Sequence, residues 1–175
     1  MKTESMDLTS HLGVLRRYAL VLTRDPGRAE DLVQEAVLRA LEGASTWREG
    51  GDLRKWLLAI VHNAHVSRCR RLKTEREAEA TLASQPVGPQ SAPQAAHVDL
   101  GQTMNALMGL PEEQREVLML VAIEGMSYRD AAECLDIPVG TLMSRLGRAR
   151  AALRAAADRT AAPEASAAPH LRLVR

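Results

Sequence analysis

The sequence predicts an all-α protein made of two small helical domains, and three observations lead to that prediction. Apolar residues recur at helical spacing along most of the 175 residues, and no stretch alternates as a strand does. The 46% hydrophobic content comes almost wholly from Ala, Leu and Val, and Phe is absent. The stretch 83–97 holds three prolines and three glutamines but no charged residue. Such a stretch cannot form a core of its own.

This pattern divides the chain into four parts: a first domain, a linker, a second domain and a fraying tail. Their predicted bounds are 1–80, 81–98, 99–158 and 159–175. Helical periodicity in the two domains predicts helices over about 8–24, 28–42, 52–76, 99–108, 110–124, 127–136 and 139–157. Asp25-Pro26 begins the second helix, and Asp52 is a suitable N-cap for the third. The first half of that third helix is apolar nearly all round, so we expect it to lie between other helices.

Residues 127–153 have the layout of a helix-turn-helix. Ser127 can cap a short helix with Asp130 three positions on, and Pro138 cannot extend that helix, so the chain must turn. In the following helix one narrow stripe is apolar, formed by Leu142, Leu146, Ala149 and Leu153. A separate face carries hydroxyls and guanidiniums, from Thr141, Ser144, Arg145 and Arg148. Arg can bind guanine bidentately, so this face predicts DNA reading. The alternative is a packed helical hairpin with a solvated Arg face.

Charge is segregated along the chain, although the net charge is only +1. A basic segment lies near the end of the third helix, formed by Arg68, Arg70, Arg71, Lys73 and Arg76. The helix-turn-helix supplies a second basic element, so we expect two contacts with a phosphate backbone. Acids gather instead at Glu30, Asp31, Glu35 and Glu42, and again at Glu112, Glu113 and Glu116. We expect those acidic surfaces to repel DNA and to suit a protein partner.

Other features limit the function classes. No nucleophile–base pair or phosphate loop is present, so we predict neither an enzyme nor a cofactor. His62 and His65 are three apart but have no evident third ligand, so we predict no metal. Cys69 and Cys134 are far apart and are expected to be reduced thiols of a cytoplasmic protein. We find neither a signal peptide nor an apolar run long enough for a membrane span.

In the second helix, Leu38 shares a face with Asp31, Gln34 and Glu35. A leucine among carboxylates and an amide is a plausible docking patch for a basic, amphipathic partner. Single exposed apolar residues are also normal on a solvated surface, so this observation alone leaves both interpretations open.

Four segments together resemble the successive motifs of the extracytoplasmic-function (ECF) sigma factors, the small two-domain sigma subunits of bacterial RNA polymerase. These segments are AEDLVQEAVLRAL (29–41), LRKWLLAIVHN (53–63), LPEEQREVLML (110–120) and GMSYRDAAECLDIPVGTLMSRLGRARAAL (125–153). They follow the family's order, with a Pro-rich linker between, over roughly residues 8–157. The resemblance is therefore more specific than a single helix-turn-helix.

The resemblance implies a subunit that binds core RNA polymerase, recognises promoter DNA and helps to melt it. Contact with the clamp of the largest polymerase subunit is implied for Asp31, Gln34, Glu35, Leu38 and Arg39. Asn63 matches a position that contacts a base of the minus-ten element, and the loop 46–52 one that captures a flipped base. Further DNA contacts are expected from Arg68, Arg70, Arg71, Tyr128, Arg129, Thr141, Ser144, Arg145 and Arg148. The family also implies an anti-sigma factor as a partner.

Three positions depart from the family's pattern: Ser67, Met143 and Gly147. Met143 should reduce phosphate contacts, and Gly147 should cost about 1 kcal/mol of helix propensity. Ser67 leaves the minus-ten preference open. Two other functions would fit part of the sequence. A stand-alone helix-turn-helix regulator would leave the first domain without a role, and a decoy that titrates an anti-sigma factor would not need the Arg-bearing face.

Overall fold

The computed structural model describes residues 7–47, 50–82 and 100–161, and every regular element in those ranges is helical. The all-α prediction is confirmed. The first domain comprises η2 (Thr9–His11), α1 (Leu12–Thr23), α2 (Pro26–Glu42), η3 (Ala44–Thr46) and α3 (Leu53–Leu82). The second comprises α4 (Leu100–Gly109), α5 (Glu112–Leu118), η4 (Met119–Ile123), α6 (Tyr128–Cys134) and α7 (Val139–Ala161). Most of the predicted linker and tail, residues 83–98 and 162–175, lies outside the described residues.

The predicted caps set the helix boundaries of the first domain. Asp25 Oδ1 accepts a hydrogen bond from the Arg28 amide at 2.7 Å, so α2 begins there with Pro26 in its first turn. Asp52 Oδ1 accepts from the Lys55 amide at 3.0 Å and caps α3 in the same way. The predicted loop after α2 contains the short η3 turn.

The second domain is held by the buried side of α7 against α5 and α6. After α5 the helix widens into the π-helical turn η4, and Gly125 then ends it with a φ of 69°. The left-handed conformation suits glycine because no Cβ is present to clash. Asp136 takes a φ of 51° in the turn between α6 and α7, a conformation that Asp tolerates better than most residues.

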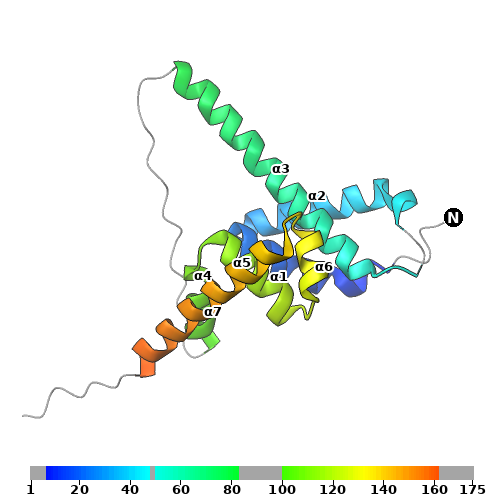
Figure 1. Ribbon diagram of the computed structural model, residues 1–175. Helices are drawn as coiled ribbons and strands as arrows, with labels where there is room; N and C mark the ends of the chain where they lie inside the picture. Colours follow the sequence, from blue (N-terminus) through cyan, green and yellow to red (C-terminus); the bar gives the residue numbers. More distant parts are fainter. Residues whose placement is uncertain (1–6, 48–49, 83–99, 162–175) are drawn as a thin grey trace, which may run out of the picture.

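The two domains pack directly against each other, α5 on α1 and α6 on α3. Their buried residues form one continuous apolar cluster. Figure 1 shows α3 running past the helices of both domains, with its C-terminal half projecting away from them. Residues 70–78 of this half are all exposed, which confirms that the basic end of α3 leaves the core.

Candidate nucleic-acid interface

Helix α7 separates an apolar side from a polar side, as predicted. The buried side is formed by Leu142, Leu146 and Ala149, each no more than 2% exposed. On the predicted base-reading face, Ser144 and Arg148 are exposed, whereas Thr141 and Arg145 are half-buried. The helix begins at Val139, after Pro138, so the polar face starts in its first turn.

The two arginines of this face have different surroundings. Arg145 Nη2 lies 3.0 Å from Glu113 Oε2 of α5, and the Arg145 side chain is only 22% exposed. Within the described ranges, Arg148 has no such ion pair. Arg145 is therefore half-buried and engaged by Glu113, whereas the Arg148 side chain is open to solvent.

The N-terminal end of α6 carries two further residues predicted to contact DNA. The Ser127 Oγ accepts a hydrogen bond from the Asp130 amide at 3.1 Å and donates one to Asp130 Oδ2 at 2.6 Å. This is the predicted capping pair. It leaves Tyr128 and Arg129 exposed at the helix N-terminus, where amides and side chains are suited to binding phosphate.

On α3, Asn63 is exposed rather than satisfied inside its domain, so its amide is available to an external partner. Arg70 and Arg71 are also exposed, whereas Arg68 is half-buried and its Nη2 lies 3.9 Å from Asp31 Oδ2 of α2. The basic end of α3 therefore starts beside the acidic face of α2.

The predicted docking patch on α2 is open to solvent. Leu38 is 61% exposed, and Asp31, Gln34 and Arg39 are exposed around it. Glu35 is half-buried and accepts a hydrogen bond from Arg39 Nη2 at 2.6 Å. The opposite side of α2 holds the helix in the core through Ala29, Leu32, Val33, Ala36 and Ala40.

A set of polar contacts between the domains was not predicted from the sequence. The Arg115 guanidinium is 1% exposed; its Nε donates to the Val21 carbonyl of α1 at 2.5 Å and its Nη1 to the Leu110 carbonyl at 2.8 Å. The Leu110 carbonyl also accepts from Arg24 Nη2 at 2.6 Å. Burial lowers the pKa of Arg115 to about 10, so the guanidinium stays charged at neutral pH. It therefore acts as a cap at the C-terminal end of α1.

Charged side chains join α3 to the second domain. The Glu124 carboxylate is fully buried and is paired with Arg54 of α3 and Arg17 of α1. Lys55 Nζ lies 2.8 Å from Asp130 Oδ1 and 2.7 Å from Glu133 Oε2 of α6. The N-terminal turns of α3 thus contact the helix that supports α7.

The acidic cluster of α5 was predicted to be a surface for a protein partner, and for Glu116 that prediction is wrong. Glu116 is 6% exposed, with Oε1 3.7 Å from Nδ1 of the buried His62. Burial raises the pKa of Glu116 to about 7 and lowers that of His62, so both side chains favour their neutral forms. Glu112 Oε1 lies 2.8 Å from His65 Nε2, and this hydrogen bond lowers the pKa of Glu112. Glu112 and Glu116 therefore contact histidines of the chain's own first domain.

Comparisons with known proteins decide the family. The family model described as Sigma-70 region 2 matches residues 8–75, and that described as Sigma-70, region 4 matches residues 100–153. The ECF RNA polymerase sigma factor EcfG of Rhodopseudomonas palustris (strain TIE-1) is 40% identical over 150 residues, which cover 85% of this chain and 82% of EcfG. The chain belongs to the ECF RNA polymerase sigma factors.

Other relatives of this ECF sigma factor agree. The ECF sigma factor SigM of Mycobacterium tuberculosis (strain ATCC 25618 / H37Rv) is 38% identical over 144 residues, 82% of this chain and 71% of SigM. The sigma factor RpoE of Bartonella quintana, solved in complex with the anti-sigma factor NepR, has a TM-score of 0.72 and 31% identity, covering 90% of this chain and 98% of RpoE. CnrH, solved with the cytosolic domain of CnrY, has a TM-score of 0.58 and 26% identity, covering 87% and 85%.

These matches extend over both domains of the sigma factor, so a stand-alone helix-turn-helix regulator would explain only half of them. The relatives are sigma factors, which are not enzymes. In the part of the chain that the structure describes, none of the helices combines the length and the apolar character needed to cross a membrane. Among the departures from the family's pattern, Met143 is 54% exposed, and both Ser67 and Gly147 are exposed.

Proposed function

We propose that this ECF sigma factor docks on core RNA polymerase through the exposed face of α2 and reads promoter DNA through α3, α6 and α7. The observation that carries the proposal is the exposure of these faces. Each of the three longest helices buries an apolar side and exposes at least half of its predicted polar residues, while Glu35, Arg68, Thr141 and Arg145 are half-buried. The two regions follow each other in the chain as the matched sigma-70 regions 2 and 4 do.

The docking surface on α2 consists of Asp31, Gln34, Glu35, Leu38 and Arg39. Its composition suits the clamp of the largest polymerase subunit, because a basic amphipathic element can bury Leu38 while its cations meet the carboxylates. Two members of this surface, Arg39 and Glu35, pair with each other, and the pair would hold both side chains in place on binding.

The proposal divides DNA recognition between the domains. Asn63 would read a base of the minus-ten element as it melts, while Arg68, Arg70 and Arg71 hold the backbone beside it. The loop at 46–52, of which 48–49 lie outside the described residues, would capture an extruded base. In the second domain α7 would enter the major groove of the minus-thirty-five element through Thr141, Ser144, Arg145 and Arg148, with phosphate contacts from Tyr128 and Arg129.

An anti-sigma factor is the proposed regulator. The B. quintana relative was solved bound to the anti-sigma factor NepR and CnrH bound to the cytosolic domain of CnrY. In bacteria the polymerase and the chromosome share the cytoplasm, which is the proposed place of action.

The proposal is tested by in vitro transcription with sigma-free core polymerase on a library of promoter sequences. Added sigma factor should confer start-site selection on a subset that shares two spaced elements. Tight binding of duplex DNA by the isolated protein, with no start-site selection when core polymerase is present, would reject a sigma function.

We expect Leu38→Ala to weaken binding to core polymerase about 5- to 10-fold, because the substitution removes apolar area that docking buries. The measurement is the Kd of labelled sigma factor for core enzyme. Ile123→Ala is the matched control, since Ile123 is 48% exposed but lies in the second domain. Equal affinities of Leu38→Ala and the native protein would remove α2 from the interface.

We expect Arg148→Ala to weaken binding of the holoenzyme to its promoter by about 1–3 kcal/mol, the discrimination of one bidentate contact with a base. Arg150→Ala is the control. It removes the same charge, and Arg150 is exposed on the other side of α7. Arg145→Ala should have a smaller net effect, since the native Arg145 must first leave Glu113. If Arg148→Ala and Arg150→Ala weakened binding equally, the effect would be general electrostatics rather than base reading.

A further inference from the structure

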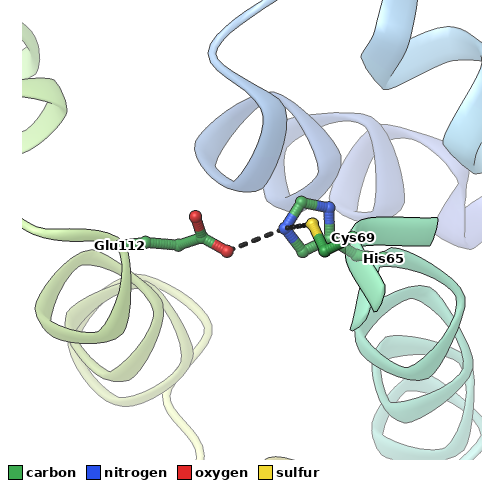
Figure 2. A group of neighbouring side chains, drawn as sticks. All are labelled: His65, Cys69 and Glu112. Atoms are coloured by element: carbon green, nitrogen blue, oxygen red, sulfur yellow. Dashed lines mark hydrogen bonds and ion pairs between the residues drawn. The ribbon is translucent and has the colours of Figure 1, made fainter. Parts of the chain in front are cut away.

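Two side chains, one from each domain, contact the same ring nitrogen of His65. His65 and Cys69 lie four residues apart on α3, and Glu112 is the first residue of α5. His65 Nε2 lies 2.8 Å from Glu112 Oε1 and 3.5 Å from Cys69 Sγ. One ligand atom of each residue lies within 4.8 Å of the others. In Figure 2 the dashed lines from the Glu112 carboxylate and the Cys69 sulfur meet at the same nitrogen of the imidazole.

The three ligand types and their separations suit a tetrahedral zinc ion. Zn²⁺ binds Cys at about 2.3 Å, His at about 2.0–2.1 Å and carboxylate at about 2.0–2.2 Å. Tetrahedral angles at those lengths place sulfur and nitrogen about 3.5 Å apart, and nitrogen and oxygen about 3.3 Å apart. The sulfur–nitrogen separation already fits, at 3.5 Å. The nitrogen–oxygen separation of 2.8 Å is shorter than this, so the carboxylate must swing off the hydrogen-bond axis to make room for the metal. The Glu112 side chain is 49% exposed and has room to move.

Charge and access also fit a divalent cation. A thiolate and a carboxylate together neutralise two positive charges. Burial raises the pKa of the Cys69 thiol, so the proton must be displaced, which a bound zinc ion does. Cys69 is exposed and lines an open hollow between α2 and α3, together with Arg28, Leu72, Lys73, Arg76 and Glu77. The hollow opens the sulfur to solvent, although three of its six lining residues are cations.

We propose that His65, Cys69 and Glu112 form a zinc-binding site that fastens the second domain onto the first. Two ligands belong to α3 and the third to α5, so the metal would bridge the domains directly. Zinc would then favour the packed arrangement of the two domains over any arrangement in which they separate. Zinc availability would thereby control how readily the sigma factor opens.

The proposal is tested on the full chain, stripped of metal and titrated with Zn²⁺ against a chromophoric chelator. One equivalent should bind. With Co²⁺ as the probe, thiolate-to-metal charge transfer and intense visible bands should report tetrahedral coordination that includes sulfur. Cys69→Ser should weaken binding at least tenfold and abolish the charge-transfer band. Cys134→Ala is the matched control, because Cys134 is the buried thiol of the second domain.

Glu112→Gln tests the bridge itself. The native protein, labelled once on each domain, should show a shorter inter-label distance when Zn²⁺ is added, or slower opening. Glu112→Gln should bind Zn²⁺ at least tenfold more weakly and lose that response, while Glu113→Gln keeps both. Circular dichroism of each variant confirms that it is folded. Absence of stoichiometric binding, native affinity in Cys69→Ser, or an unchanged domain response in Glu112→Gln would each overturn the proposal. None of these outcomes bears on start-site selection, so the sigma function is tested separately.

Discussion

Replacing Arg115 by Met should lower the free energy of unfolding by about 3 kcal/mol, the scale expected when a buried hydrogen-bonded charge is removed. Met has a similar length but no donor. The Val21 carbonyl in the last turn of α1, where helix carbonyls lack an intrahelical donor, would lose its hydrogen bond from Arg115 Nε. The Leu110 carbonyl would keep only its hydrogen bond from Arg24 Nη2. Urea denaturation followed by circular dichroism measures the loss.

Arg16→Met is the matched control for Arg115→Met. The Arg16 side chain is 56% exposed and pairs with Glu30 inside the first domain, so replacing Arg16 should cost much less stability than replacing Arg115. The distance between labels on the two domains gives a second readout. Because Arg115 bonds across the domain boundary, Arg115→Met should lengthen that distance under native conditions, whereas Arg16→Met should not. Equal losses of stability in the two variants, with no change in distance, would mean that Arg115 does not hold the domains together.

The helices could be predicted because their signals are local. Three helices begin at capping residues that the sequence shows directly: Asp25, Asp52 and Ser127. The buried residues of α7 likewise repeat at helical spacing. The exposed recognition faces follow from the same periodicity. Leu38 is exposed as predicted, since its position on α2 is fixed by which residues the helix must bury. Whether these faces bind polymerase and DNA stays a prediction.

The packing of one domain on the other could not be predicted from such signals. Glu116 was predicted to lie on an acidic surface, and Arg115 was not singled out. Both are buried, because α1 packs on α5 and His62 of α3 lies against Glu116. Glu112 comes to His65 from 47 residues away, so no local spacing showed the third ligand. One signal was present. The first half of α3 is apolar nearly all round, and the two other helices of its domain cannot surround it. A third layer was therefore required, which α5 and α6 supply.

The contribution of Glu116 to the stability of the packed sigma factor should fall as the pH rises from about 4.5 to about 7. Burial raises the pKa of this carboxyl from 4.5 to about 7, and the nearby Glu112 acts in the same direction; His65, Arg115 and Arg145 oppose the shift. Between those two values the folded chain binds more protons than the unfolded chain. The free energy of unfolding therefore falls as pH rises through that window and becomes constant above it.

His62 contributes with the opposite sign, so the test compares two proteins rather than one profile. Burial lowers the pKa of His62 below 6.5. The stability that the neutral His62 contributes is therefore lost as the pH falls below about 6.5. Glu116→Gln removes only the carboxyl. Stability is measured by urea denaturation with a metal chelator in the buffer. Glu116→Gln should match the native protein near pH 4.5 and exceed it by about 3 kcal/mol near pH 8. Glu113→Gln, on the exposed side of α5, should show no such growth with pH. A difference between Glu116→Gln and the native protein that did not change with pH would mean that Glu116 is ionised in the packed state, and that His62 or Arg115 holds it as a buried ion pair.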